Sequence, residues 1–297
     1  MKIIIKTKKK KKFTIFEIYF KIFIIMFLLY IYYFIKSIII SYSKDNITLV
    51  TALFKMKSKF PLDLYLNWVE NLLLLNSSIV FYVDKELLNI VKRKRPKMYE
   101  NKTIWIESSI YDFYSYKNFK KYFEESYKID KEKSYHSVPL YMIWAEKCNF
   151  LKKAIYKNYF HSKCFYWIDA GYFRFKEDKY INNWPSTKRC YEDSRVILNG
   201  MRKLSVEEIE GLKNFNISIY NNFINKVNVA GGLFGGKSFY LIRFINLYYK
   251  AIKIFIKHNF FIGKDQNLFA YISYLNPKIV KIINSKDWYY FKIYLSE

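Results

Sequence analysis

From residue 47 onward, short runs of β-forming residues alternate with segments whose apolar residues recur at helical spacing. The run ITLVTALF at 47–54 has the length and the β-branched content of a buried strand. A helical pattern follows from Pro61 to Leu75, and SIVFYV at 78–83 is typical of the next strand. Such alternation implies crossover connections between parallel strands. The sequence therefore predicts an α/β domain over residues 47–297, with a mainly parallel sheet flanked by helices.

The rest of this domain continues the alternation. Further strands are expected at 103–106, 165–168, 226–234 and 279–283. Further helices are expected at 85–93, over most of 111–160, at 207–214, at 238–257 and after Asp265. The first connection between a strand and a helix, residues 55–61, contains no glycine, which argues against a dinucleotide-binding fold.

The N-terminal segment has a different pattern. Residues 1–17 are rich in lysine, and residues 18–40 are 23 positions with only Lys21 and Lys36 charged. About 20 apolar residues span the hydrocarbon core of a bilayer, and lysines near the ends can reach its interfaces. We therefore expect a basic cytoplasmic tail at 1–17, a transmembrane signal anchor at 18–40 that contacts the lipid bilayer, and a short stem at 41–46. The domain would face the lumen of the Golgi or endoplasmic reticulum, as in a single-pass type II membrane protein of a eukaryotic cell.

A cleaved signal peptide is the alternative to an anchor, because Ser41 and Ser43 offer small residues in a cleavage-like arrangement. Three cysteines are too few for a disulfide scaffold, although one bridge and one free thiol would fit. A glycoprotein with a lumenal domain is compatible with four N-x-S/T sequons, at Asn46, Asn76, Asn101 and Asn216.

The net charge of +26 raises the question of a nucleic-acid partner. Seven of the 51 basic residues lie within the first twelve positions, and the others are spread among Ile, Tyr, Phe and Asn. These residue types share AT-rich codons, so genome composition accounts for much of the charge. No nucleic-acid-binding motif is present, and we expect no nucleic-acid partner.

A polar site is expected where the strand at 165–168 ends. Asp169 follows an aromatic run and would lie at the carboxyl edge, where open α/β sheets bind ligands. Gly171 allows a sharp turn or the close approach of a ligand. A carboxylate there could hold a divalent cation or a sugar hydroxyl. The alternative is a strand followed by an ordinary turn.

Two further loops could contribute to the same edge. The stretch VAGGLFGGK at 229–237 contains half of the eight glycines, which indicates tight backbone geometry or close approach of a ligand. A β-bulge leading into a helix is the other reading. In GKDQ at 263–266, Asp265 could cap the following helix, and this would not exclude a chemical role.

The order of these motifs resembles the HtrL/YibB (WlaTC-like) family of candidate glycosyltransferases. The resemblance covers residues 47–283 and rests on ITLVTALF at 47–54, IVFYVD at 79–84, WAEK at 144–147, FYWIDAGYFR at 165–174, VAGGLFGG at 229–236 and GKDQ at 263–266. It implies a glycosyltransferase-A-like fold. The implied activity transfers a sugar from a nucleotide-sugar donor to a hydroxyl acceptor on a glycan, protein or lipid.

Roles for individual residues follow as hypotheses. Asp265 is the expected base that deprotonates the acceptor if the reaction inverts configuration. Gly231 and Gly232 would let the backbone approach donor or acceptor sugar, and Trp144 could stack on a sugar or base. The expected donor site comprises Thr51, Ala52, Asp84, Arg95, Lys147, Trp167, Asp169, Gly171 and Arg174.

A Mn²⁺ or Mg²⁺ ion at Asp169 would stabilise the departing diphosphate, because hard cations prefer carboxylate oxygens. Related enzymes carry an Asp-x-Asp motif here, whereas this chain has Gly171 at the third position. The missing acid leaves open a rival reading, a non-catalytic membrane-anchored protein that binds glycans or nucleotides with the same fold. Structural or surface roles are expected for His136, His161 and His258, which lack metal-ligand spacing.

Overall fold

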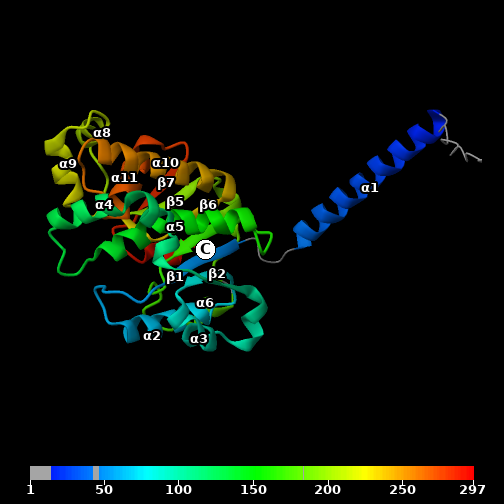
Figure 1. Ribbon diagram of the computed structural model, residues 1–297, viewed down its shortest axis with the longest axis horizontal. Helices are drawn as coiled ribbons and strands as arrows, with labels where there is room; N and C mark the ends of the chain where they lie inside the picture. The colour runs from blue at the N-terminus through cyan, green and yellow to red at the C-terminus, as the bar shows by residue number, and fades with distance from the viewer. Residues whose placement is uncertain (1–14, 43–46, 183) are drawn as a thin grey trace, which may run out of the picture. The chain divides into compact units, whose positions relative to one another are not determined.

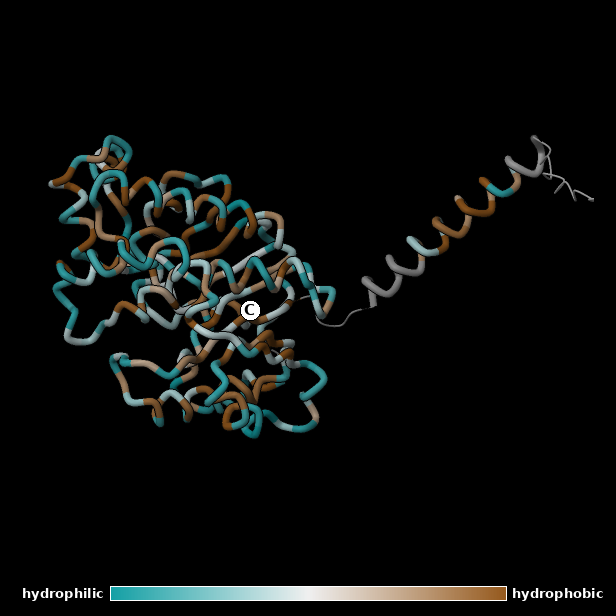
Figure 2. Tube along the Cα trace, in the orientation of Figure 1, coloured by the Kyte–Doolittle hydropathy of each residue, from teal (hydrophilic) through white to brown (hydrophobic). Residues whose placement is uncertain are grey.

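A computed structural model describes residues 15–42, 47–182 and 184–297, which fall into two compact units divided between Lys44 and Asp45. The described part of the first unit is one helix, α1 (Ile15–Tyr42). Its central residues are mostly apolar, as Figure 2 shows. Across the described positions, no helix is long and apolar enough to cross a membrane. The predicted tail, up to position 14, and the predicted stem from position 43 lie outside the described residues.

The second unit is built on a mixed, mostly parallel sheet (Figure 1). In its described part, seven strands occur in the order β3-β2-β1-β4-β6-β5-β7. Strand β6 is antiparallel to both of its neighbours, and the other four pairings are parallel. The strands are β1 (Ile47–Leu53), β2 (Ser78–Val83), β3 (Thr103–Glu107), β4 (Cys164–Ile168), β5 (Val196–Gly200), β6 (Val229–Lys237) and β7 (Val280–Asn284).

Helices cover both faces of this sheet (Figure 1). One face carries α2 (Leu62–Leu73), α3 (Lys85–Arg93) and the short helices α6 (Asp178–Ile181), α7 (Lys188–Glu192) and α12 (Tyr290–Tyr294). The other face carries α4 (Tyr114–Ile129), α5 (Val138–Lys157), α8 (Val206–Lys213), α9 (Ile217–Ile224), α10 (Ser238–Lys257) and α11 (Asp265–Leu275). Two short 3₁₀ helices, Lys97–Lys102 and Ile110–Asp112, flank β3. Each face of the sheet thus has its own hydrophobic core.

Side chains of β4 alternate between these two cores. Phe165 and Trp167 pack on the side of α5, whereas Tyr166 and Ile168 pack on the side of α2. Because successive residues of a strand point to opposite faces, Asp169 continues on the side of α5 as it leaves the strand. This parity brings its carboxylate toward α5.

The predicted α/β architecture is confirmed, but two features of the sheet were not predicted. Strand β5 was missed, since its sequence ends in Asn199-Gly200, a pair typical of turns. Strand β6 runs through Lys237, so Gly235 and Gly236 pair with β4 instead of forming a loop. The glycine-rich segment is therefore largely a central strand.

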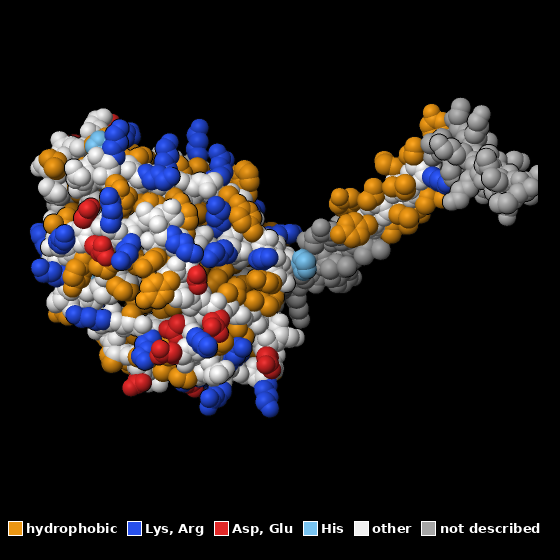
Figure 3. Space-filling model, in the orientation of Figure 1, with side chains coloured by type: hydrophobic (Ala, Val, Ile, Leu, Met, Phe, Trp, Pro, Cys, Tyr) orange, Lys and Arg blue, Asp and Glu red, His pale blue; other side chains and the backbone are white. Residues whose placement is uncertain are grey.

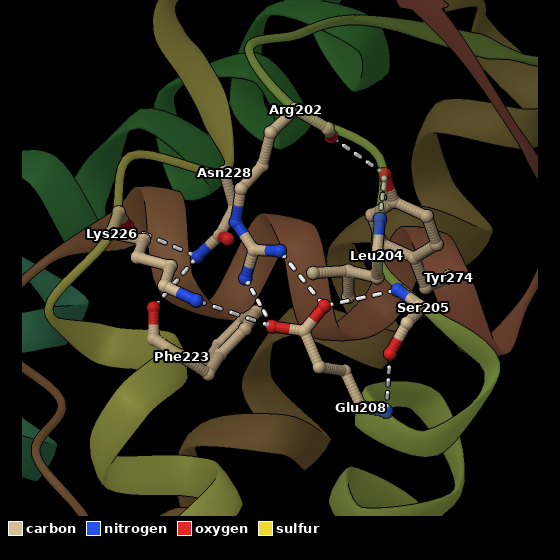
Figure 4. Close-up of polar contacts among 8 residues, drawn as sticks. All are labelled: Arg202, Leu204, Ser205, Glu208, Phe223, Lys226, Asn228 and Tyr274. Atoms are coloured by element: carbon tan, nitrogen blue, oxygen red, sulfur yellow. Dashed lines mark hydrogen bonds and ion pairs between the residues drawn. The ribbon is translucent and has the colours of Figure 1, made fainter.

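The connection from β5 to β6 is held by a polar cluster (Figure 4). Arg202 donates through both terminal nitrogens to the Glu208 carboxylate, at 2.9 and 2.8 Å. Ser205 and Glu208 form a capping box at the start of α8. The Tyr274 hydroxyl, from α11, accepts from the Leu204 N–H and donates to the Arg202 carbonyl. These contacts hold the segment that contains α8 and α9 against α11.

One disulfide joins Cys164, at the start of β4, to Cys190 on α7, with their Cα atoms 6.0 Å apart. Cys148, on α5, is a buried free thiol. The structure thus contains the one bridge and one free thiol that the sequence allowed. On the face that Figure 3 displays, Lys and Arg side chains are spread among apolar and acidic ones.

Candidate functional site

Lys147 lies at the meeting point of four elements. Helix α5 begins where the Ser137 side chain accepts from the Leu140 N–H, and it carries Lys147 beneath the end of β4. The Lys147 Nζ lies 3.0 Å from Asp169 Oδ1 and 2.9 Å from Asp265 Oδ2, on α11. It also donates to the Gly231 carbonyl of β6, at 3.0 Å. An ammonium group has three N–H donors, so these three acceptors match its full capacity.

The two carboxylates keep this buried lysine charged. Burial by itself lowers the pKa of Lys147, but Asp169 and Asp265 outweigh it and raise that pKa above its ordinary value. Burial raises the pKa of Asp265, and Lys147 opposes the rise. Lys147 is therefore a cation at neutral pH, and with both acids ionised the cluster carries one net negative charge.

The two acids differ in access. The Asp169 side chain is 40% exposed, whereas that of Asp265 is only 3% exposed. Asp169 Oδ1 also accepts from the Trp167 indole N–H at 2.7 Å, and its backbone N–H donates to the Gly232 carbonyl. Asp169 is thus held on three sides and still accessible to a ligand.

Glycines on β6 make room for both carboxylates. A Cβ atom on Gly231 would lie 3.1 Å from Asp265 Oδ2. A Cβ atom on Gly232 would lie 3.2 Å from Asp169 Oδ2 and 3.2 Å from the Tyr172 ring. These separations are tighter than ordinary van der Waals contact, so the predicted close approach occurs between this strand and the two acids.

A cleft opens above Asp169 at the carboxyl ends of β1 and β4. Its walls are mainly aromatic, and they include Trp144, Trp167, Tyr172 and Trp288 together with Ala52 and Arg174. A second cavity lies beside it, shares Phe54 with it, and extends over the ends of β2 and β3. Two neighbouring hollows therefore lie along the carboxyl edge of the sheet.

Arg174 supplies a cation to the cleft. Its guanidinium carbon lies 3.5 Å from the ring centre of Trp68 and 5.0 Å from that of Phe60. Its Nε is buried, and Arg174 forms no hydrogen bond or ion pair with any residue that the structure describes. Stacking on aromatic faces is favourable for a guanidinium but leaves its N–H donors unused. An anionic ligand in the cleft would satisfy them.

Most of the predicted donor residues come together here. Ala52, Lys147, Trp167, Asp169 and Arg174 line the cleft. Gly171 and Trp144 also line it. A Cβ atom on Gly171 would lie 2.9 Å from the Trp68 ring, so this glycine permits close packing of α2. The structure thus groups residues that lie more than a hundred positions apart in the sequence.

Three predicted donor residues have other surroundings. Thr51 is fully buried and does not line the cleft, so its predicted place in the donor site is corrected. Asp84 caps α3 by accepting from the Leu87 N–H, and it lines the second cavity instead. Arg95 lines neither of the two cavities.

Arg95 is a structural residue. Its guanidinium is buried and donates to the carbonyls of Leu73, Leu75 and Ser77 and to the Thr103 hydroxyl. These partners lie at the amino ends of β2 and β3, away from the cleft. The predicted phosphate contact of Arg95 is therefore wrong.

Asp265 is also corrected. It does not line the cleft, and its carboxylate is buried against Lys147. In this position it cannot reach an acceptor hydroxyl as a base. It is the first residue of α11, with its Oδ1 accepting from the Gln266 N–H at 2.8 Å, and Lys264 is the N-cap residue. Asp265 contacts Lys147, and Lys147 in turn contacts Asp169.

Sequence reasoning missed Trp288 and Tyr289, which line the cleft from the segment after β7. The rule that located Asp169 would have found them, since ligands bind beyond the carboxyl ends of strands and β7 was predicted. Their aromatic character was read as ordinary composition in a chain with 21% aromatic residues.

A second acidic group lies next to the start of α11. Asp130, Glu132 and His136 have ligand atoms within 4.8 Å of one another. Asp130 already accepts from the Tyr141 hydroxyl and contacts His136 Nδ1 at 2.6 Å, while Glu132 pairs with Lys264. Because each acid already has a partner, we interpret this group as a structural tie. The sequence showed no metal-ligand spacing around His136, so this grouping was not predicted.

A family model described as a bacterial protein of unknown function, HtrL_YibB, matches residues 45–296. No curated protein matches the chain. The matched range spans nearly the whole second unit, from β1 to the last helix, and includes every residue of the Lys147 cluster. The chain therefore belongs to the HtrL_YibB family.

Proposed function

We propose that the second unit is a glycosyltransferase with a glycosyltransferase-A-like fold. It moves a sugar from a nucleotide-sugar donor to a hydroxyl acceptor on a glycan, protein or lipid. The observation that carries this proposal is Asp169, an accessible carboxylate held by a buried lysine at the carboxyl edge of the sheet. Ligands of open α/β sheets bind at this edge, and aromatic walls with a few polar groups are typical of small-molecule sites.

The donor's diphosphate has a matching cation in Arg174. Loss of the sugar leaves negative charge on the diphosphate, and a fixed guanidinium stabilises that charge as it develops. The second cavity, lined by Lys55, Asp84 and Ser108, offers hydrogen-bonding groups for the nucleoside. Phe54 lines both spaces, so the nucleoside and the sugar of one donor could lie on either side of it.

Asp169 has two uses that its exposure allows. A Mn²⁺ or Mg²⁺ ion, when bound, would neutralise charge on the diphosphate. Asp169 would supply one carboxylate oxygen to such an ion, and magnesium sites often combine one or two carboxylates with substrate phosphates. Asp265 cannot add a second ligand while it is paired with Lys147. Alternatively, Asp169 orients a sugar hydroxyl directly.

The location of the domain is part of the proposal. The Cys164–Cys190 disulfide favours an oxidising compartment, outside the cytoplasm. The sequons at Asn101 and Asn216 lie on exposed residues, where a glycan could attach. These features agree with a lumenal or otherwise extracytoplasmic domain, and the Golgi or endoplasmic reticulum stays a prediction.

The test is nucleotide release by purified residues 45–297 from a panel of sugar nucleotides, with and without Mn²⁺. We expect release by the wild-type domain and a loss on the order of 100-fold in Asp169→Asn. Asp178→Asn is the matched control, because this acid on α6 is exposed and lies outside the cleft. Equal activity of Asp169→Asn and Asp178→Asn would contradict the site, and no release with any donor would contradict the enzyme.

The alternative is a non-catalytic protein that binds glycans or nucleotides. The observation that favours it is that Asp169 is the only acid among the described residues that line the cleft, because Gly171 stands where related enzymes have a second acid and Asp265 is buried. Calorimetry with the same donors separates the two functions. Binding without nucleotide release in the presence of acceptor sugars would support the alternative.

A further inference from the structure

The segment 285–289, directly after β7, forms one wall of the cleft. Trp288 and Tyr289 both line it together with Asp169. In the sheet order, β7 lies on the opposite side of β4 from β1 and β2. This wall therefore approaches Asp169 from the side away from the second cavity.

The backbone of this segment is fixed by buried side chains. Asn199 of β5 is 1% exposed, and its amide donates to the carbonyls of Asp287 and Trp288 at 2.7 and 3.3 Å. Its Oδ1 accepts from the Ser285 hydroxyl at 2.7 Å. The Tyr172 hydroxyl adds a contact to the Trp288 carbonyl at 3.4 Å. Because a buried amide is costly unless it is paired, these contacts hold the segment in one place.

The Trp288 side chain takes no part in these hydrogen bonds, which involve only the backbone of Trp288. It is half-buried, and it makes no ring contact or indole hydrogen bond with the residues that the structure describes. Its neighbours differ, because Tyr289 packs edge-on against Tyr172 at 5.4 Å and Trp167 donates to Asp169. Trp288 is thus a pre-positioned aromatic ring that faces the cleft without a partner.

We propose that Trp288 is the platform against which the pyranose ring of the acceptor sugar stacks, next to Asp169. A pyranose presents C–H groups to an aromatic face and hydroxyls at its rim. The Trp288 ring would pack against the C–H groups, and the Asp169 carboxylate would accept hydrogen bonds from the hydroxyls. A large rigid ring on a fixed backbone also loses little conformational freedom when it binds a ligand.

The choice of acceptor over donor rests on the proposed function. A nucleotide over the ends of β1 and β2 would place its diphosphate near Arg174 and its sugar at Asp169. The acceptor must then approach the same sugar from the remaining side, where Trp288 lies. The platform is therefore the element that selects a cyclic sugar as the acceptor.

The first test measures binding of simple sugars without catalysis. Saturation-transfer NMR on the full chain uses methyl glucoside, methyl galactoside, N-acetylglucosamine and lactose as probes. We compare the wild type with Trp288→Ala, Trp288→Phe and the control Trp105→Phe. Trp105 is half-buried on β3, packs on Phe81 and lies outside the cleft.

We expect at least one probe to bind the wild type and the Trp105→Phe variant equally. Its dissociation constant should rise about tenfold or more in Trp288→Ala, with a smaller rise in Trp288→Phe, which keeps an aromatic face. Unchanged circular dichroism confirms that the variants are folded. Equal affinity in Trp288→Ala, or no binding of any probe, would overturn the platform.

A second readout separates the platform from the proposed function. With an active donor, Trp288→Ala should raise the acceptor KM about tenfold, whereas Trp105→Phe, outside the cleft, should leave that KM unchanged. An unchanged acceptor KM would overturn the platform and leave the glycosyltransferase intact. Probe binding through Trp288 in a chain that releases no nucleotide from any donor would refute the glycosyltransferase and support the platform as a sugar site.

Discussion

The ammonium group of Lys147 has as many acceptors as it has protons, and two of them are carboxylates. Removing the cation while keeping the size of the side chain, as in Lys147→Met, leaves the buried Asp265 carboxylate without a counter-ion. Breaking a buried pair in this way costs about 3–5 kcal/mol of unfolding free energy. We expect this loss for residues 45–297 in urea unfolding followed by circular dichroism.

A second substitution tests whether that loss is electrostatic. Asp265→Asn removes the stranded charge, so the double variant Lys147→Met/Asp265→Asn should recover part of the stability that Lys147→Met loses. If the single variant Lys147→Met unfolds like the wild type, the ion pairs contribute nothing. If the double variant is less stable than the single one, packing and not charge dominates.

Asp193 gives a pH dependence of known sign. The Arg195 side chain is the main cause that lowers the pKa of Asp193, although burial opposes it, and Lys281 adds a contact at 3.3 Å. A carboxyl whose pKa is lower in the folded state binds fewer protons there. Its stabilisation is therefore full above its unfolded pKa of about 3.9 and is lost as the pH falls through the folded value.

The matching measurement compares Asp193→Asn with the wild type in urea at pH 7 and pH 3. At pH 7 the wild type should have a larger free energy of unfolding than Asp193→Asn. This difference in unfolding free energy should be smaller at pH 3. Asp178→Asn, at an exposed carboxyl, should show little difference at either pH. A difference between the wild type and Asp193→Asn that is the same at both pH values would refute the account.

The residues that the sequence located correctly share one physical rule. Ala52 and Asp169 were placed by the carboxyl ends of predicted strands, and the structure has them in one cleft. The prediction for Thr51 failed because its side chain is fully buried within the domain and does not line the cleft. The prediction for Arg95 failed because the sequence around an arginine does not show whether its guanidinium binds a phosphate or donates to backbone carbonyls, as it does here. The ion pair of Lys147 with Asp265 could not be predicted, because the sequence does not show that α5 and α11 lie next to each other.

Strand β6 is the element on which the position of Asp169 depends, and Gly232 tests this dependence. A methyl group at Gly232 would press on Asp169 Oδ2 and the Tyr172 ring. We expect Gly232→Ala to move the exposed acid and reduce nucleotide release at least about tenfold, since small displacements of catalytic groups are costly. The domain should remain folded by circular dichroism.

Gly231→Ala is the comparison for this prediction. Its methyl group would press on Asp265, which lies one step farther from the cleft. We therefore expect a smaller loss of nucleotide release than in Gly232→Ala. If Gly232→Ala keeps full activity, or if Gly231→Ala is the more damaging change, β6 does not set the position of Asp169.

The elements of the parallel half of the sheet could be predicted because each is a compact apolar run. In the other half, the strand at 226–234 was predicted but its antiparallel direction was not, because direction depends on pairing between distant segments. Gly235 pairs with Tyr166 and Ile197 at once, and no local signal records such contacts. The glycines looked like a loop, although they allow two neighbouring strands to pack closely around β6.

Across the whole second unit, the Cys164–Cys190 disulfide links the central strand β4 to the surface helix α7. The bridge closes a loop whose ends are 26 residues apart, and a loop of that size contributes about 3.5 kcal/mol in the chain-entropy account. We expect Cys190→Ser, or reduction of the wild type, to lower the unfolding midpoint in urea. Cys148→Ala removes only the free thiol, so reductant should still lower the unfolding midpoint of this variant. A wild-type midpoint that reductant does not change would refute the contribution.

The N-terminal unit carries the prediction with the widest consequence for the molecule, attachment to a lipid bilayer through residues 18–40. We expect the full chain to stay with lipid vesicles after an alkaline wash and residues 45–297 to be released. The uncharged run from Ile22 to Ile35 is the reason for this expectation, whereas each lysine at the centre of a helix costs about 2.5–3.5 kcal/mol on insertion. The double variant Ile25→Lys/Leu29→Lys should therefore wash off like the shortened chain. If the unaltered full chain washes off as well, residues 18–40 are not an anchor, and a type II orientation of the domain has no physical basis.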